Sequence, residues 1–189
     1  MKLRHLLLLL LAVCLLSAAV WAQSAPAAPA AAAPKAPPLS PPGQAEFAFA
    51  DGKKITITYS RPLMRGRKIM GDLVPYGKVW RTGANAATSL VTDTDLVVAN
   101  ARVPAGKYTL YTVPGEQTWT IIINKQTGQW GLRYDQAQDL VRVEVMPVKL
   151  RAAVDQFTIR FDREGPAKAT LKIEWENTSV PVPVSEAGK

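Results

Sequence analysis

The stretch "KKITITY", residues 53–59, decides the fold class because apolar and polar side chains alternate along it. In an extended chain, Ile55, Ile57 and Tyr59 lie on one face and the residues between them on the other. A period of two predicts a strand with one buried and one exposed face. The same alternation recurs in "VRVEV" (141–145), "FTIRF" (157–161) and "LKIEW" (171–175).

Turn signals separate these stretches at short intervals. The "DG" pair at 51–52 is typical of a tight hairpin. Four further signals are expected to act in the same way: "PAG" (104–106), "PG" (114–115), "TG" (127–128) and "REGP" (163–166).

The remaining segments fit the same fold. "WTIII" at 119–123 is almost continuously apolar, which favours a strand covered on both faces. No segment keeps a helical spacing long enough for a substantial helix, although "LRYDQAQD" (132–139) fits one helical turn. We therefore predict an all-β fold, a single antiparallel β-sandwich or barrel of about eight to ten short strands.

Residues 1–22 have the pattern of a secretory signal peptide. Lys2 and Arg4 precede an apolar run that extends from Leu6 to Val20, and "VWA" (20–22) ends in residues suited to signal peptidase. The run is short for a membrane span. We therefore expect export to the periplasm or the extracellular space, with no transmembrane segment in the mature protein.

Cleavage after Ala22 would remove Cys14 and His5, the only Cys and the only His of the chain. Without a thiol or an imidazole, the mature protein cannot build a Cys or a Ser–His–Asp nucleophile. It also lacks the usual ligands of zinc, copper and iron, so we expect no metal and no cofactor. The alternative for this end of the chain is a lipoprotein anchor at Cys14, which branched Val13 disfavours.

The segment 23–43 contains eight Ala and seven Pro. Such a composition cannot bury a core and predicts a disordered linker. Residues 44–189 are long enough for one β domain with its own core.

The formal net charge of the chain is +8, and loss of Lys2 and Arg4 leaves 21 basic against 15 acidic residues, a net of +6. For an exported protein, this charge favours a small anion, an acidic glycan or a lipid headgroup as partner over nucleic acid. The alternative is that the basic surface serves solubility alone.

Two adjoining segments interrupt the strand rhythm, "SRPLMRGRKIMGDLVPYG" (60–77) and "KVWRTGANAATSL" (78–90). Long ordered loops of compact domains frequently carry function. We expect them to fold against each other and form a ligand-binding site, whose candidate residues are Arg65, Arg67, Tyr76, Trp80, Arg81, Thr82, Gly83 and Asn85.

Each residue type has a role in such a site. Arginine presents a planar fork that matches a carboxylate or a phosphate. Thr82 and Asn85 offer directional hydrogen bonds, Gly83 gives a ligand access to the backbone, and Trp80 and Tyr76 offer stacking faces. In the structural alternative, Trp80 is a core anchor, Gly83 serves only a turn, and Arg81 pairs with an acid such as Asp72.

These residues carry a resemblance to a known family. The segments involved are "YSRP" (59–62), "GRKIMGDLVPYGKVWRTGAN" (66–85), "PAGKYTLYTVPG" (104–115), "WTIIINK" (119–125), "QWG" (129–131) and "DQFTIRFD" (155–162). They resemble the bacterial domain-of-unknown-function family 2911 (DUF2911) from about Phe47 to Val182. The resemblance implies an exported bacterial β domain and carries over no catalytic role. The resemblance also implies an acid after the Asn of the signature, but this chain has Ala86 there, which disfavours a role for that position in binding a metal or moving protons.

The leading hypothesis is therefore a non-catalytic envelope module that binds a small anionic or sugar-like ligand. One alternative is a hydrolase that works without His or Cys, for which Asp72, Ser60 and Lys78 are the nearby groups. The pair Asp135 and Asp139 is a further carboxylate candidate, although surface acids are the simpler interpretation. The other alternative is a structural or protein-interaction module.

Overall fold

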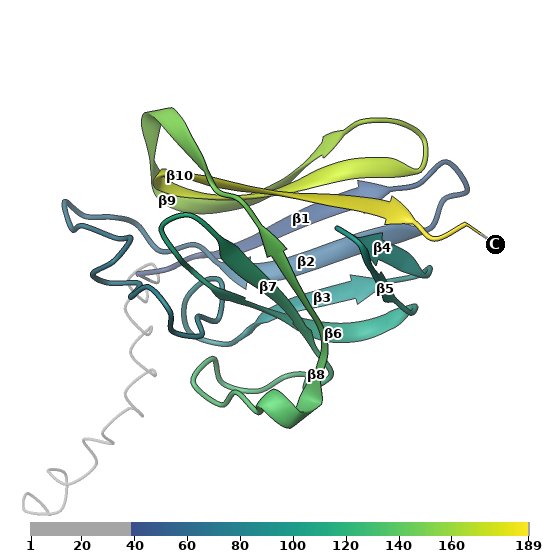
Figure 1. Cartoon of the computed structure of the whole chain (residues 1–189), viewed down its shortest axis with the longest axis horizontal. Helices are drawn as coiled ribbons and strands as arrows, with labels where there is room; N and C mark the ends of the chain where they lie inside the picture. Colours follow the sequence, from purple (N-terminus) through teal and green to yellow (C-terminus); the bar gives the residue numbers. More distant parts are fainter. Residues whose placement is uncertain (1–38, 189) are drawn as a thin grey trace, which may run out of the picture. The chain divides into compact units, whose positions relative to one another are not determined.

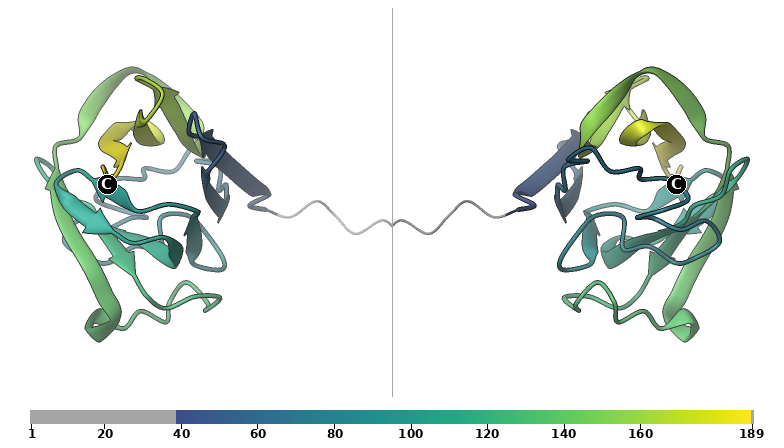
Figure 2. Two further views of the ribbon diagram at one scale, coloured as in Figure 1. Left: turned by 90° about the vertical axis from the view of Figure 1, so that its right-hand side faces the viewer. Right: turned by 90° about the vertical axis from the view of Figure 1, so that its left-hand side faces the viewer.

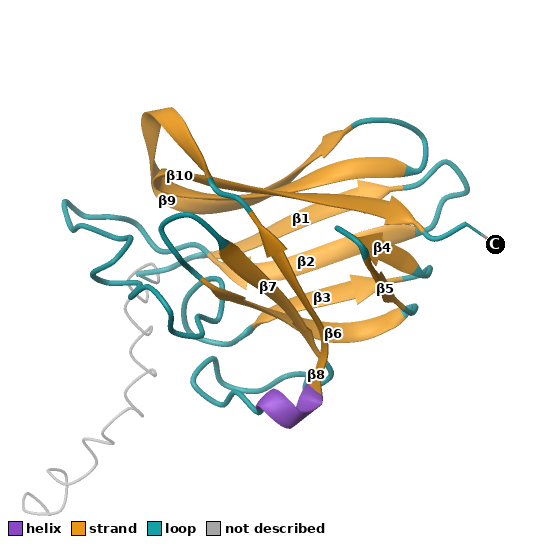
Figure 3. Cartoon of the chain, in the orientation of Figure 1, coloured by secondary structure: helices purple, strands orange, loops and turns teal. Residues whose placement is uncertain are grey.

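The computed structural model describes residues 39–188, and nearly all of their regular structure is β-strand (Figure 3). Along the chain the strands are β1 (Pro42–Ala48), β2 (Lys54–Ser60), β3 (Thr88–Thr92), β4 (Leu96–Val98), β5 (Ala101–Val103), β6 (Gly106–Val113), β7 (Trp119–Asn124), β8 (Asp139–Val145), β9 (Val148–Arg163) and β10 (Lys168–Glu186). A 3-10 turn at Gln136–Gln138 lies within 132–139, where one helical turn was expected. The predicted signal peptide, and the predicted linker up to residue 38, lie outside the described residues.

The strands form two antiparallel sheets that pack against each other (Figure 1). The six-stranded sheet has the order β1-β2-β3-β6-β7-β8, and the four-stranded sheet has the order β5-β4-β10-β9. Views from the two ends show the sheets on either side of a shared interior (Figure 2). The predicted all-β fold is confirmed, and of the two architectures named it is the sandwich. Among residues 39–188, no helix has the length and apolar character needed to cross a membrane.

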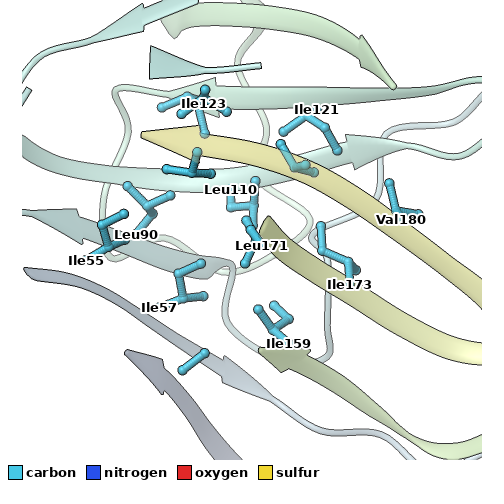
Figure 4. Close-up of a cluster of buried hydrophobic side chains, with 14 of the residues drawn as sticks. Ile55, Ile57, Leu90, Leu110, Ile121, Ile123, Ile159, Leu171, Ile173 and Val180 are labelled. Carbon is cyan, nitrogen blue, oxygen red and sulfur yellow. The ribbon is translucent and has the colours of Figure 1, made fainter. Parts of the chain in front are cut away.

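The alternation that predicted the strands also builds the core. In β2, Ile55, Ile57 and Tyr59 are buried while Thr58 between them is exposed. The predicted strand at 119–123 is β7, and it is covered on both faces as expected. Branched side chains of the two sheets meet in one layer, including Ile55, Ile57, Leu90, Leu110, Ile121 and Ile123 from the six-stranded sheet and Ile159, Leu171, Ile173 and Val180 from the other (Figure 4).

The chain passes repeatedly from one sheet to the other. Strands β4 and β5 belong to the four-stranded sheet, whereas β3 and β6 on either side of them pair with each other in the six-stranded sheet. The "PAG" signal at 104–106 therefore links two sheets, and the hairpin predicted there was wrong. A turn motif reports local backbone geometry and not the partner of the next strand. The other signals do lie between paired strands: "DG" (51–52), "PG" (114–115), "TG" (127–128) and "REGP" (163–166).

The β domain begins slightly before the predicted boundary at residue 44. Pro42 and Gly43, which were assigned to the linker, pair with Ser60 and Tyr59 of β2. Proline lacks an N–H but fits here because β1 is an edge strand of its sheet.

An irregularity in β10 positions the long connection 61–87 between β2 and β3. The pairing of β10 with β9 shifts register on both sides of Glu176, whose φ is +53°. The Glu176 carboxylate accepts hydrogen bonds from the backbone N–H groups of Ile69 (3.2 Å) and Met70 (3.1 Å). Because Ile69 and Met70 are themselves buried, this part of the connection belongs to the core.

Replacing Ile57 by Ala tests whether this residue lies on the buried face of β2. Ile57 is fully buried between the sheets, so Ile57→Ala should lower the free energy of unfolding by about 2–5 kcal/mol, through lost transfer free energy and a residual cavity. The matched control is Thr58→Ala on the exposed face of the same strand, which should cost below about 1 kcal/mol. Urea unfolding measures both, and equal losses would contradict the assignment.

Candidate functional site

The connection 61–87 is tied to the six-stranded sheet at Trp80. Trp80 N donates to Thr112 O at 2.7 Å, and Thr112 N donates to Trp80 O at 2.9 Å. Trp80 therefore pairs with β6 two residues beyond Leu110, where the pairing of β3 with β6 ends at Thr88. The connection 61–87 is the blue-to-teal loop on the left of Figure 1. Because successive side chains of an extended chain point to opposite sides, a Trp80 that packs into the core directs Arg81 away from it.

The Trp80 indole packs against aromatic rings from both sheets. Its ring centroid lies 6.3 Å from that of Trp119 in β7 and 5.1 Å from that of Phe157 in β9. It also stacks on Trp175 in β10, at 6.0 Å and an interplanar angle of 16°. The indole Nε1 donates to Gly83 O at 3.1 Å, which closes the turn that follows. Trp80 is therefore the anchor of the connection.

The turn after Arg81 uses left-handed backbone. Thr82 has φ +53°, and its side chain is fully buried. Its hydroxyl donates to Thr112 Oγ1 at 3.2 Å, and the Thr88 hydroxyl donates to Thr82 O at 2.7 Å. Thr82 was predicted to contact a ligand. The structure instead places it in the interior, where these hydrogen bonds hold a backbone conformation that a β-branched residue rarely adopts.

A pocket of about 280 Å³ opens beside this turn. We call it the Arg81 pocket. Five of the eight predicted site residues line it: Arg65, Arg67, Trp80, Arg81 and Gly83. The other lining residues are Leu39, Ser40, Pro62, Leu63, Leu73, Val74, Ala84 and Trp175. No lining residue is acidic, so the charge of the three guanidinium groups is not neutralised within the pocket.

Arg81 lacks an internal counter-ion. None of the ion pairs formed among residues 39–188 includes it, so the alternative in which Asp72 pairs with Arg81 is not realised. Its Nε is buried and has no hydrogen-bond partner in the described part of the chain. The aliphatic stem lies against Gly131, where a Cβ would collide with Arg81 Cδ. Burial lowers the pKa of Arg81, but an arginine remains protonated at neutral pH.

Arg65 and Arg67 are held by backbone carbonyls. Arg65 Nη2 donates to Leu39 O at 3.2 Å. Arg67 Nε donates to Met64 O at 2.9 Å, and its Nη2 donates to Leu63 O at 2.8 Å. A guanidinium has five N–H donors, so both side chains keep donors for a ligand while their orientation is already set.

The remaining predicted residues lie outside the Arg81 pocket. Asn85 is exposed with φ +60°, and its amide lies 3.5 Å from Ser60 Oγ. Tyr76 is 39% exposed and opens onto a second pocket of about 400 Å³, together with Lys68 and Glu116. The predicted residues therefore do not form one site.

Two carboxylates that the sequence analysis did not single out line the second pocket. These are Glu116 and Glu176, and both oxygens of Glu176 are bonded to backbone N–H groups. Burial raises the pKa of Tyr76, and the charges of these two carboxylates add to the effect. Within residues 39–188, no group of three or more Asp, Glu, His or Cys side chains is arranged to hold a metal ion.

Asp135 and Asp139 serve the loop between β7 and β8 separately. Asp135 Oδ1 accepts from Ala137 N at 3.0 Å and caps the 3-10 turn. Asp139 accepts from Tyr134 OH at 2.6 Å, from Arg142 Nη1 at 2.7 Å and from the Asn124 amide at 2.7 Å. Asp135 Oδ1 and both oxygens of Asp139 are thus engaged in structural hydrogen bonds.

Three lining residues from outside the connection 61–87 were not predicted: Leu39, Ser40 and Trp175. Leu39 and Ser40 were assigned to the linker, because the composition of segment 23–43 does not indicate that its end lines a pocket. Trp175 was predicted as a buried strand residue, which it is, with 2% of its surface exposed. Its place beneath the pocket depends on the approach of the connection to β10, which no local pattern encodes.

The fold and the site together define a class: an antiparallel β-sandwich with a cationic pocket where a long connection packs against both sheets. The chain belongs to the family described as "Protein of unknown function (DUF2911)", whose model matches residues 40–184 and confirms the resemblance. Comparisons with curated proteins and with solved structures gave no match.

Gly83→Ala should destabilise the fold. A Cβ at Gly83 would lie 3.1 Å from Ser60 O and 3.2 Å from Thr88 Oγ1, and the φ of +155° is unfavourable for other residues. The expected loss is about 1–3 kcal/mol in the free energy of unfolding, measured with urea. At Gly165 an added Cβ meets nothing, so Gly165→Ala should stay within about 0.5 kcal/mol of the wild type. A Gly83→Ala variant as stable as that control would mean that the turn is not rigid.

Proposed function

We propose that this protein is a non-catalytic binding module for a small anion, which it takes into the Arg81 pocket. The observation that carries the proposal is the convergence of three arginines on a pocket whose lining contains no acid. Arginine pairs with carboxylates and phosphates through two parallel N–H···O bonds, a geometry that gives both strength and direction.

Arg81 has the central role in this proposal. Its guanidinium is partly desolvated and lacks an internal partner for Nε, so an oxyanion would satisfy a group that the described chain leaves unsatisfied. Arg65 and Arg67 are more exposed and would add charge at the rim. Attraction at the rim is screened over about 8 Å at physiological ionic strength, so affinity should fall as salt is added.

We further propose that binding takes place after export. The signal-peptide pattern of residues 1–22 and the net positive charge of the remainder support this location. In the envelope or outside the cell, the ligand would be a metabolite or a fragment of an acidic glycan or lipid rather than nucleic acid.

Arg81→Gln should weaken anion binding about tenfold or more, because a charge-assisted hydrogen bond contributes about 1.5–3 kcal/mol. The measurement is isothermal titration calorimetry of the purified protein with sulfate, phosphate, benzoate and glucuronate. Arg151→Gln is the matched control, since Arg151 is exposed on β9 and does not line the pocket.

Unfolding of both variants in urea accompanies the titrations, so that a loss of binding is separated from a loss of fold. Binding that is equal in wild type and Arg81→Gln would contradict the proposed site. No binding of any of these anions, together with a marked loss of stability in Arg81→Gln, would favour the structural alternative, in which the arginines only hold the connection.

A further inference from the structure

The Arg81 pocket has a second property besides its charge, because its cationic groups stand beside an apolar wall. The wall is formed by Pro62, Leu63, Leu73 and Val74 of the connection 61–87. Leu73 keeps 45% of its surface exposed, so its side chain is available to a ligand in the pocket. An inorganic oxyanion would contact the arginines and leave this wall in water.

The floor of the pocket offers apolar surface only. Trp80 and Trp175 both line the pocket, and their indole rings are stacked. The Nε1 of Trp80 donates to Gly83 O at 3.1 Å, and the Nε1 of Trp175 donates to Asp155 O at 3.1 Å. Since an indole has one donor and no acceptor, neither ring can hydrogen-bond a ligand. They can contribute only contact with an apolar group.

The dimensions fit a ligand larger than a simple oxyanion. A cavity of about 150 Å³ lined by apolar side chains is large enough to hold benzene. The Arg81 pocket has a volume of about 280 Å³. It therefore has room for a ring of that size together with a charged group. Apart from the three arginines, which only donate, Ser40 is the one described lining residue with a free side-chain hydrogen-bonding group, so few acceptors face the hydroxyl groups of a sugar.

We infer that the Arg81 pocket takes an organic anion, in which a carboxylate or phosphate is joined to an apolar body about the size of a phenyl ring. This inference rests on the proposed function and narrows its ligand from anions in general to amphipathic ones. The oxyanion would lie against Arg81, with Arg65 and Arg67 at the rim, and the apolar body would lie against Leu73 and the accessible part of the Trp80 indole. Removing the apolar body from water on binding would add to the affinity that the charge contacts supply.

Matched pairs of ligands test the inference: acetate against phenylacetate, and phosphate against phenyl phosphate. Binding is followed in the purified full-length protein by ¹⁵N NMR of the Arg81 Nε–H, which reports weak affinities as well as strong ones. We expect each phenyl compound to bind about tenfold or more tightly than its partner. Glucuronate, which has a carboxylate on a hydroxylated ring, should bind no better than acetate.

Leu73→Ser supplies the mutational test. Leu73 is partly exposed, so the variant should fold, and urea unfolding verifies this. It should reduce the preference for phenylacetate over acetate severalfold. Leu132→Ser is the control, because Leu132 is 76% exposed and does not line the pocket.

The possible outcomes distinguish a failure of the apolar-body inference from a failure of the anion site itself. Equal binding of acetate and phenylacetate at Arg81 would overturn the apolar-body inference and leave the anion site standing. Tighter binding of glucuronate than of phenylacetate would overturn it in favour of a sugar-like ligand. If none of these compounds shifts the Arg81 signal, the anion site itself is wrong and the inference falls with it.

Discussion

Packing of the Trp80 indole at the end of the core is the interaction on which the candidate site depends. The ring meets Trp119 from one sheet and Phe157 and Trp175 from the other. A large aromatic side chain buries about 150–250 Å², so this contact fixes the connection 61–87 firmly. The next residue of an extended chain points the other way. Arg81 is therefore held outside the core, and its buried Nε has no hydrogen-bond partner among residues 39–188.

Two arginines elsewhere in the sandwich are paired with carboxylates. Arg160 pairs with Glu174 at 3.1 Å, and Arg142 pairs with Asp139 at 2.7 Å, so each has a carboxylate within its own region of the sandwich. Arg65 and Arg67 are instead oriented by carbonyl groups, which hold a guanidinium in place without cancelling its charge. Guanidinium groups that are held in a fixed orientation and keep their positive charge are expected at an anion-binding site rather than in a structural ion pair.

The sequence predicted the connection 61–87 and its arginines because long basic loops are recognisable from residue types alone. It grouped Thr82 and Asn85 with the arginines, whereas neither residue lines the Arg81 pocket. Both have left-handed backbone, which the sequence does not signal at Thr82 because β-branched residues rarely adopt it. Trp175 was recognised as a core residue but not as the pocket floor. Its position depends on the register shifts around Glu176 and on the bonds from Glu176 to Ile69 and Met70.

The sequence by itself determined the strands and their buried faces, because the alternation of side chains along an extended chain is a local property of the backbone. The tertiary structure alone decided which residues meet at the pocket. Leu39, Arg81 and Trp175 are brought together by packing between segments far apart in the chain, and Gly131 supports Arg81 from yet another loop. Such contacts depend on the shape and volume of many side chains at once, which the spacing of residues along the chain does not encode.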